Sequence, residues 1–311
     1  METKPNPLDY FYILNNGLKI PCLGLGTARM EEIPDIIYSS IKDGIRLIDT
    51  ATMYNNEELV GKGIKKVLDD KIVSREELFI VTKLYVDSKM DPEIEIQKSL
   101  KLLQLDYIDL YLDHWPISYR YDEDEKTHIK NTPLHEFWPK MERLVEKGYT
   151  KSIGVSNYNI QSLCNLLSFC KIKPACNEVE FHPYLYQKNL LDFCNKVNIR
   201  LIAFTPFLKG GYIHKMYKDN LPQLLEENVL KELAVKYDKT PGQIVLNWLY
   251  CLGIISIPRT NNPKRMEENL GACYFKMEES DLNKISKLNE NARFCNPLLW
   301  NERYQNIPYF S

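Results

Sequence analysis

Short apolar runs alternate with longer amphipathic segments along most of the chain. Eight runs have the length and the continuous hydrophobic character of buried parallel strands, and they lie at residues 21–26, 45–49, 78–82, 107–112, 152–155, 176–181, 201–204 and 254–257. Segments with helical periodicity follow at 31–43, 57–70, 92–104, 134–148, 159–170, 187–198, 223–252 and 263–271. This repeated alternation predicts an α/β fold, a (β/α)8 TIM barrel, rather than an open doubly wound sheet.

The two ends of the chain add smaller features to this barrel. Asn15, Asn16 and Gly17 separate two short apolar stretches, a pattern typical of a β-hairpin that would close the bottom of the barrel. The segment after the last predicted helix is expected to form a C-terminal loop over the active site. No linker divides the sequence, so residues 1–311 are predicted to form a single barrel domain.

Charge and cysteine usage exclude several classes of protein. Lys and Arg number 40 against 42 Asp and Glu, a formal charge of −2, which gives no electrostatic reason to expect nucleic acid or an acidic membrane as a partner. The eight cysteines show no C-x-x-C spacing, and the N-terminus lacks the pattern of a signal peptide. We therefore expect a cytoplasmic protein that acts on a small molecule. The sequence leaves the choice between monomer and dimer open.

Four residues at consecutive strand exits could perform acid–base chemistry. Active sites of such barrels lie at the carboxyl ends of the strands, and Asp49, Tyr54, Lys83 and His114 all follow or end predicted strands. An ammonium group beside a phenol favours phenolate, so Lys83 would make Tyr54 a better proton donor. Asp49 would neutralise Lys83. An imidazole could then orient a carbonyl group whose oxygen takes up the proton.

The last predicted strand runs into a basic segment. Arg259, Lys264 and Arg265 surround the start of a predicted helix, and barrels often bind phosphate beyond strands seven and eight. A solvated basic surface is the alternative interpretation. No G-x-G-x-x-G follows a strand and no G-x-x-x-x-G-K-[ST] occurs, so a Rossmann domain is not expected.

Several ordered motifs resemble those of the aldo-keto reductase family, including its aldose and xylose reductases. They are GLGT at 24–27, RLIDTA-xx-Y at 46–54, TK at 82–83, DLYL-x-HWP at 109–116, GVSNY at 154–158, E-x-HPY at 180–184 and IPRT-xxxx-R-xx-EN at 257–269. The resemblance extends over nearly the whole chain. It implies that Tyr54 is the general acid, that Asp49 and Lys83 tune it, and that His114 orients the substrate carbonyl.

The same resemblance implies a nicotinamide cofactor. The residues that it assigns to cofactor binding are Thr27, Asp49, Ser156, Asn157, Glu178, Phe204, Thr205, Pro206, Arg259, Thr260, Arg265, Glu268 and Asn269. Two guanidinium groups suit the 2′-phosphate of NADPH, which makes NADPH the expected cofactor and NADH a less favoured one.

Four positions depart from the family's usual pattern. The family commonly has Gln at the position of Glu178, and Glu has no amide group with which to donate to a carboxamide oxygen. It commonly has Tyr where Phe204 stands, and Phe keeps the stacking face. Ala28 replaces a large aromatic residue, which should widen the pocket. Asp113 replaces an aliphatic residue and, by strand alternation, should point away from the pocket.

The tail resembles that of the sugar-reducing members. Its residues Cys295 and Trp300, together with Ala28, Tyr85 and Trp115, are expected to surround a substrate pocket suited to an aldose or another small aldehyde. Two other functions remain open at this point. One is an NADPH-binding regulatory barrel with little turnover, and the other is a non-redox phosphate-binding enzyme such as an isomerase.

Overall fold

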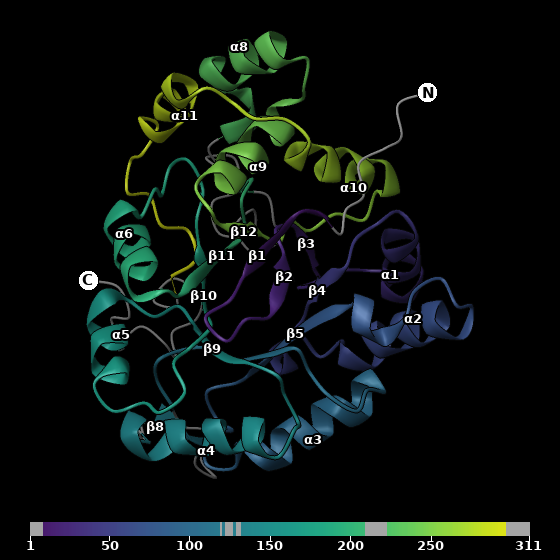
Figure 1. Ribbon diagram of the computed structural model, residues 1–311, viewed down its shortest axis with the longest axis vertical. Helices are drawn as coiled ribbons and strands as arrows, with labels where there is room; N and C mark the ends of the chain where they lie inside the picture. Colours follow the sequence, from purple (N-terminus) through teal and green to yellow (C-terminus); the bar gives the residue numbers. More distant parts are fainter. Residues whose placement is uncertain (1–8, 119, 122–126, 129–131, 209–222, 297–311) are drawn as a thin grey trace.

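The computed structural model describes residues 9–118, 120–121, 127–128, 132–208 and 223–296. An N-terminal hairpin precedes a ring of parallel strands that is surrounded by helices (Figure 1). In the hairpin, β1 (Phe11–Ile13) pairs antiparallel with β2 (Lys19–Pro21). Gly17 turns the chain between them with a φ of +86°, a backbone conformation that glycine adopts readily. The predicted hairpin is confirmed.

The central sheet has the strand order β12-β11-β10-β9-β6-β5-β4-β3. The strands are β3 (Gly24–Gly26), β4 (Leu47–Asp49), β5 (Phe79–Leu84), β6 (Leu110–Asp113), β9 (Ile153–Ser156), β10 (Cys176–Glu180), β11 (Arg200–Phe204) and β12 (Ile255–Ser256). Each strand overlaps a predicted apolar run and extends beyond it by two residues at most. A short antiparallel pair, β7 (Arg120–Tyr121) and β8 (Thr127–His128), follows β6.

The two edge strands of this sheet meet and close it into a barrel. The amide of Ser256 donates to the carbonyl of Cys22 at 3.0 Å, and the amide of Gly26 donates to the carbonyl of Pro258 at 3.3 Å. A Cβ at position 26 would lie 2.8 Å from the carbonyl oxygen of Ile257, so this closure requires glycine there. The predicted (β/α)8 barrel is therefore confirmed.

The helices surround the barrel and leave its interior to the strands (Figure 1). They are α1 (Ile33–Lys42), α2 (Glu57–Asp69), α3 (Pro92–Leu103), α4 (Leu134–Glu146), α5 (Ile160–Leu167), α6 (Lys188–Val197), α8 (Asn228–Tyr237), α9 (Pro241–Cys251), α10 (Pro263–Leu270) and α11 (Glu279–Ser286). Single 3-10 turns lie at η2 (Thr52–Tyr54), η3 (Arg75–Glu77), η5 (Leu224–Glu226) and η6 (Gly271–Cys273).

The structure refines two predictions about these helices. The single segment predicted at 223–252 is divided into η5, α8 and α9, because Asp238 adopts a left-handed conformation with φ 52° and Thr240 caps a new helix through the amide of Gln243. Helix α11 was not predicted, and its eight residues carry only two buried side chains, Asp281 and Ile285.

Two hydrophobic cores lie on the two sides of the sheet. The larger core packs the outer faces of the strands against the helices. The smaller core fills the barrel interior, where Leu14 and Ile20 of the hairpin region pack with Leu47, Leu110 and Ile202 of the strands. The hairpin therefore closes one end of the barrel. The carboxyl ends of the parallel strands remain at the opposite end, where they can form a site.

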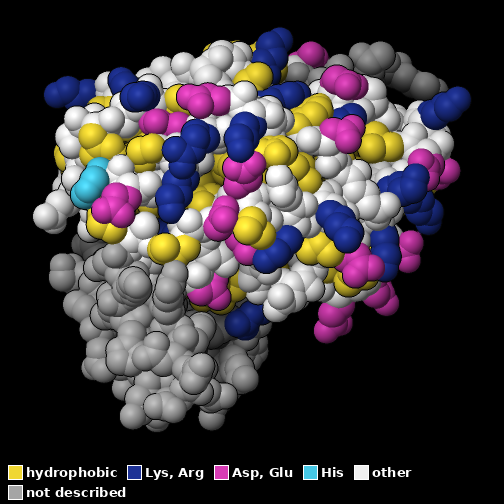
Figure 2. Space-filling view, turned by 90° about the horizontal axis from the view of Figure 1, so that it is seen from below, with side chains coloured by type: hydrophobic (Ala, Val, Ile, Leu, Met, Phe, Trp, Pro, Cys, Tyr) yellow, Lys and Arg dark blue, Asp and Glu magenta, His cyan; other side chains and the backbone are white. Residues whose placement is uncertain are grey.

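The outer surface carries charges of both signs. On the face seen in Figure 2, Lys and Arg side chains alternate with Asp and Glu, and hydrophobic side chains are scattered between them. Such mixing agrees with the formal charge of −2 and gives this face no single-sign field. Within the described ranges, no helix has the length and apolar character needed to span a membrane.

Candidate active site

A cavity of about 860 Å³ opens at the carboxyl ends of the barrel strands. Its volume is in the range of sites that bury small molecules and cofactors. The predicted site residues that line it are Ala28, Asp49, Tyr54, His114, Trp115, Asn157, Glu178, Phe204, Thr205, Pro206, Arg259, Thr260, Arg265, Glu268, Asn269 and Cys295. Residues from the start of the chain and from its end therefore meet in one cavity, as the sequence predicts.

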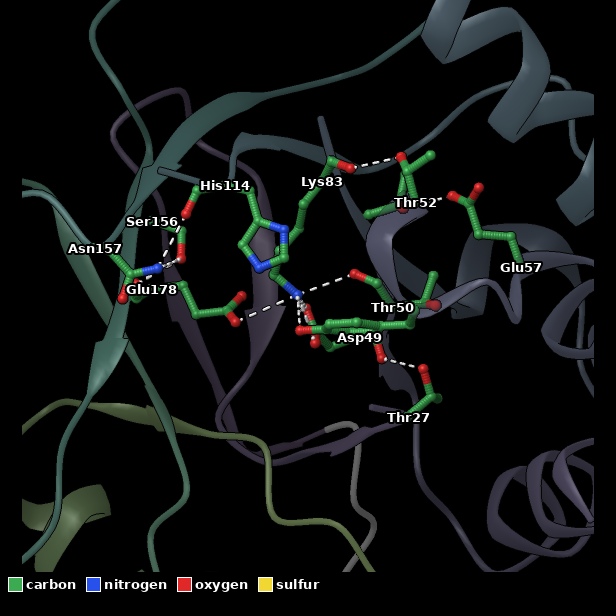
Figure 3. A network of polar contacts seen from close by, with 12 residues as sticks. Thr27, Asp49, Thr50, Thr52, Glu57, Lys83, His114, Ser156, Asn157 and Glu178 are labelled. Atoms are coloured by element: carbon green, nitrogen blue, oxygen red, sulfur yellow. Dashed lines mark hydrogen bonds and ion pairs between the residues drawn. The ribbon is translucent and has the colours of Figure 1, made fainter. Parts of the chain in front are cut away.

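Lys83 lies at the centre of the polar contacts beneath this cavity (Figure 3). Its ammonium group contacts the two carboxylate oxygens of Asp49 at 2.6 and 2.7 Å, and it donates to the carbonyl of Thr50 at 2.9 Å. The Lys83 side chain is fully buried. A buried ammonium requires a counter-charge and hydrogen-bond acceptors, and the end of β4 supplies both.

The ion pair has a large effect on Lys83. Burial lowers the pKa of the Lys83 ammonium, but the charges of Asp49 and Glu178 raise it by more, so the net shift is upward. Lys83 therefore stays protonated at neutral pH. Its own carbonyl accepts a 2.7 Å hydrogen bond from the hydroxyl of Thr52, which ties the turn after β4 to β5.

Tyr54 ends the turn η2 and lies beside Lys83. Its hydroxyl is 3.4 Å from the Lys83 ammonium nitrogen, which also lies 5.1 Å from the centre of the phenol ring. Burial raises the pKa of Tyr54, and the carboxyl groups of Asp49 and Glu178 raise it further, whereas Lys83 lowers it. The expected influence of Lys83 is present, but burial outweighs it.

His114 directly follows β6 and lines the same cavity. Its imidazole ring lies edge-on to the Tyr54 ring, with 5.8 Å between centres, and it stacks on Trp115 at 6.4 Å. Burial lowers the pKa of His114 well below its ordinary value, and the charges of Lys83 and Lys89 lower it further. The ring is therefore neutral at pH 7, with one nitrogen that donates and one that accepts.

The loop after β9 supports His114 from the other side. The side-chain amide of Asn157 donates to the carbonyl of His114 at 3.0 Å, and its backbone amide donates to the backbone carbonyl of Glu178 at 2.9 Å. Ser156 donates its hydroxyl to the same Glu178 carbonyl at 2.8 Å. Asn157 has a φ of 63°, a conformation that Asn tolerates better than most residues. These bonds fix the ends of β6, β9 and β10 relative to one another.

Glu178 brings a second carboxyl group to Lys83. One of its oxygens, Oε1, lies 3.3 Å from the Lys83 nitrogen, and the side chain is 2% exposed. The other oxygen, Oε2, is buried and has no hydrogen-bond partner among the described residues. Burial raises the pKa of Glu178 well above its ordinary value, and the Asp49 charge raises it further, against the opposing effect of Lys83.

The basic end of the cavity lies around helix α10. Asn262 caps this helix by accepting from the amide of Lys264 at 3.0 Å, and Pro263 occupies its first turn. Arg259 and Arg265 both line the cavity there. Arg259 donates through Nη1 to the carbonyls of Ala28, at 3.1 Å, and Arg29, at 2.8 Å. The arginine thereby fixes the loop after β3 to the exit of β12.

Several supporting residues were not predicted from the sequence. Thr50 donates to the side-chain oxygen of Asn56 at 2.7 Å, and Asn56 donates to the carbonyl of Thr27 at 2.9 Å, so these residues hold the exit of β4. Glu180 accepts from the amides of Phe294 and Cys295, at 2.9 and 2.8 Å. The polar residues that follow β4 in the sequence could have indicated Thr50 and Asn56. No sequence signal links Glu180 to the tail.

Four predicted residues do not line the cavity. Thr27 instead donates to the carbonyl of Asp49 at 2.9 Å, and Ser156 bonds to β10 as described above. Tyr85 lies next to His114, with 5.9 Å between ring centres. Lys83 lies behind Asp49 and Tyr54. Trp300 and the rest of the expected C-terminal loop beyond residue 296 lie outside the described residues.

Asp113 points away from the cavity, as strand alternation predicts, and it has partners there. Its carboxylate oxygen Oδ2 accepts from the Lys89 ammonium and from the Tyr158 hydroxyl, both at 2.7 Å. Lys89 also donates to the carbonyl of Trp115 at 2.5 Å and lies 4.9 Å from the centre of the Phe137 ring. This buried pair holds the loop after β5 against the exit of β6.

A closed barrel with ionisable groups gathered at its strand ends is the architecture of a barrel enzyme. The sequence profile of the Aldo/keto reductase family matches residues 23–290. Aldose reductase B of Dictyostelium discoideum is 37% identical over 308 residues, which cover 94% of this chain and 96% of that protein. An NADH-dependent D-xylose reductase of Candida parapsilosis is 37% identical over 316 residues, which cover 96% of each protein.

Two further comparisons agree. An NADPH-dependent D-xylose reductase of Meyerozyma guilliermondii is 36% identical over 318 residues, which cover 96% of this chain and 98% of that protein. The crystal structure of a Bombyx mori aldo-keto reductase in complex with NADP superposes with a TM-score of 0.86 at 34% identity, covering 94% of this chain and 96% of that one. This chain belongs to the aldo/keto reductase family.

Proposed function

We propose that this protein reduces an aldehyde, an aldose sugar or another small carbonyl compound, to the alcohol with NADPH. Membership of the family makes it an oxidoreductase that acts on carbonyl groups. The observation that carries the proposal is the placement of Tyr54, whose hydroxyl lies 3.4 Å from the buried Lys83 ammonium in the same cavity as His114. These three groups suit carbonyl reduction: Tyr54 can donate a proton, Lys83 stabilises the phenolate that remains, and His114 can hydrogen-bond to the carbonyl oxygen.

The cavity has features that fit a nicotinamide cofactor. The unpartnered Oε2 of Glu178 is an acceptor for the amide hydrogens of a carboxamide, and the aromatic face of Phe204 offers a stacking surface. Arg265 lies near the N-terminus of α10, where a phosphate group is favoured. When bound, NADPH supplies a hydride. Relatives named for NADH and for NADPH both exist, so NADH remains a possible second donor.

Tyr54 then acts as the general acid that protonates the carbonyl oxygen. Lys83, held by Asp49, stabilises the phenolate that forms when Tyr54 gives up its proton. The neutral His114 donates a hydrogen bond to the same oxygen and so directs it toward Tyr54. Trp115, Cys295 and Ala28 line the part of the cavity where a small aldehyde would lie.

The mechanism predicts a specific outcome for Tyr54→Phe. Removal of the hydroxyl deletes the proton donor and leaves the ring, so kcat should fall by about 10²- to 10⁴-fold while the Kd for NADPH changes by less than about threefold. NADPH oxidation with xylose, glyceraldehyde and an aromatic aldehyde measures the first quantity, and fluorescence titration measures the second. Retention of wild-type activity by this variant contradicts the mechanism. Tight NADPH binding without turnover by the wild type favours a regulatory barrel.

We also infer a cytoplasmic protein whose residues 1–311 form one domain. All eight cysteines are free thiols, which is typical of proteins from reducing compartments. The described residues contain no group of three or more His, Cys, Asp or Glu side chains arranged to hold a metal ion. The protein is expected to work as a monomer or a dimer.

A further inference from the structure

Two carboxyl groups share one buried ammonium at the base of the cavity. Asp49, from β4, contacts the Lys83 nitrogen at 2.6 Å, and Glu178, from β10, lies 3.3 Å from the same nitrogen (Figure 3). The three side chains are 3%, 2% and 0% exposed for Asp49, Glu178 and Lys83. If both carboxyls were ionised, this almost fully buried cluster would carry a net negative charge, which is unfavourable.

The contacts show which carboxyl group interacts more weakly with the Lys83 ammonium. An ammonium group has three hydrogens to donate. The shortest contacts of the Lys83 ammonium are with both oxygens of Asp49 and the carbonyl of Thr50, at distances between 2.6 and 2.9 Å, and the Tyr54 hydroxyl follows at 3.4 Å. Glu178 is further away, and its Oε2 is buried without a partner. An ionised Glu178 would therefore be poorly satisfied, whereas a protonated one needs only a single acceptor for its hydrogen.

Asp49 can be that acceptor. Burial raises the pKa of both carboxyl groups most, and a hydrogen bond from Glu178 to Asp49 would raise the pKa of Glu178 further and lower that of Asp49. The other titratable groups around Glu178, apart from Asp49 and Lys83, are uncharged at neutral pH. His114 is neutral, Tyr54 keeps its proton, and burial raises the pKa of the nearby Cys176 and Cys295 thiols.

We propose that Glu178 carries a proton at neutral pH, donates it in a hydrogen bond to Asp49, and thereby keeps the cluster neutral so that Tyr54 can act as an acid. This inference rests on the proposed function for its catalytic part. Glu178 is a positioning residue here, because it acts on Tyr54 through Asp49 and Lys83. Loss of its proton to solvent adds a negative charge beside the forming phenolate.

The consequence appears in the pH dependence. Burial already raises the pKa of Tyr54, and a charged Glu178 raises it further. Tyr54 is then a weaker proton donor. As the pH rises through the pKa of Glu178, kcat for aldehyde reduction should therefore fall about tenfold per pH unit. Glu178→Gln keeps the shape of the neutral acid and cannot ionise. Its kcat, measured with saturating NADPH and compared with its own value at low pH, should lack the alkaline decline.

Infrared spectroscopy tests the proton directly in the protein without cofactor. The carbonyl stretch of a protonated carboxylic acid should be present at pH 7 in the wild type, and the part due to Glu178 should be absent in Glu178→Gln. Unfolding gives a second readout. Because the folded pKa of Glu178 exceeds its unfolded value, its contribution to stability is present below the unfolded pKa and is lost as the pH rises through the folded one. Glu178→Gln should lose less stability over that range.

Glu57→Gln is the matched control. Glu57 is also buried, and its carboxyl accepts from Thr82 at 2.6 Å and from Ser99 at 3.2 Å, without a contact to Lys83. Burial raises its pKa as well, so this variant can also remove an infrared band. It should leave the alkaline decline of kcat unchanged, because its carboxyl is outside the Lys83 cluster.

The outcomes separate the two proposals. Loss of the infrared band in Glu178→Gln supports a protonated Glu178 whether or not the protein reduces aldehydes. Failure of the wild type to reduce any aldehyde would count against the proposed function alone. The inference is overturned if Glu178→Gln removes no protonated carboxyl band at pH 7. It is also overturned if the variant reduces aldehydes with the same alkaline decline as the wild type.

Discussion

The buried pair between Asp113 and Lys89 offers a sharp test of how the cavity wall is held. Asp113→Leu removes the carboxylate and leaves the Lys89 ammonium, which is 3% exposed, with the carbonyl of Trp115 and the face of Phe137 as its remaining partners among the described residues. Removing one partner of a buried ion pair typically costs about 3–5 kcal/mol. For a chain of this size we expect the apparent Tm to fall by roughly 5–8 °C.

The double variant Asp113→Leu with Lys89→Met separates the ion pair from simple packing. Replacing both partners by apolar side chains of similar volume is often nearly neutral, so the double variant should regain most of the lost stability. Urea unfolding of the wild type, both single variants and the double variant gives the coupling energy. A loss below about 1 kcal/mol in Asp113→Leu, or a double variant no more stable than the single one, would refute this reasoning.

Two further predictions concern the cofactor and the tail. Arg265→Leu should raise the Kd for NADPH about tenfold or more and change the Kd for NADH by less than about twofold, because only NADPH carries a 2′-phosphate. Fluorescence titration with each nucleotide measures both values, and an equal loss of affinity for the two would contradict the assignment. Glu180→Ala removes the acceptor of the Phe294 and Cys295 amides, so KM for aldehydes should rise severalfold with a smaller change in kcat. Steady-state kinetics measures this, and an unchanged KM would exclude a role for the anchor.

Much of the fold could be predicted because barrel strands are buried on both faces and therefore form continuous apolar runs. The run at 107–112 corresponds to β6, although the strand itself spans Leu110–Asp113. The division of 223–252 was less clear, since a single Asp such as Asp238 tolerates the left-handed conformation but does not by itself predict it. Only Thr240 and the proline after it indicated a new helix.

The candidate site was predictable where one residue follows one strand. Rules that place strand ends at one edge bring Asp49, Lys83 and His114 together without knowledge of distances. The contact between Lys83 and Glu178 could not be predicted in this way. It joins β5 to β10, which are not neighbours in the sheet, and it depends on how far each side chain reaches across the barrel. The partner of Asp113 lies in a loop, where periodicity carries no information.

The two buried lysines have a shared effect on His114. Lys83 and Lys89 both lower the pKa of this imidazole, and burial lowers it most. Each lysine is paired with a buried carboxylate, Lys83 with Asp49 at 2.6 Å and Lys89 with Asp113 at 2.7 Å. A neutral imidazole can donate a hydrogen bond but is a poor source of protons at pH 7. His114 therefore orients the carbonyl while Tyr54 supplies the proton, because their surroundings push the pKa values of the two groups apart.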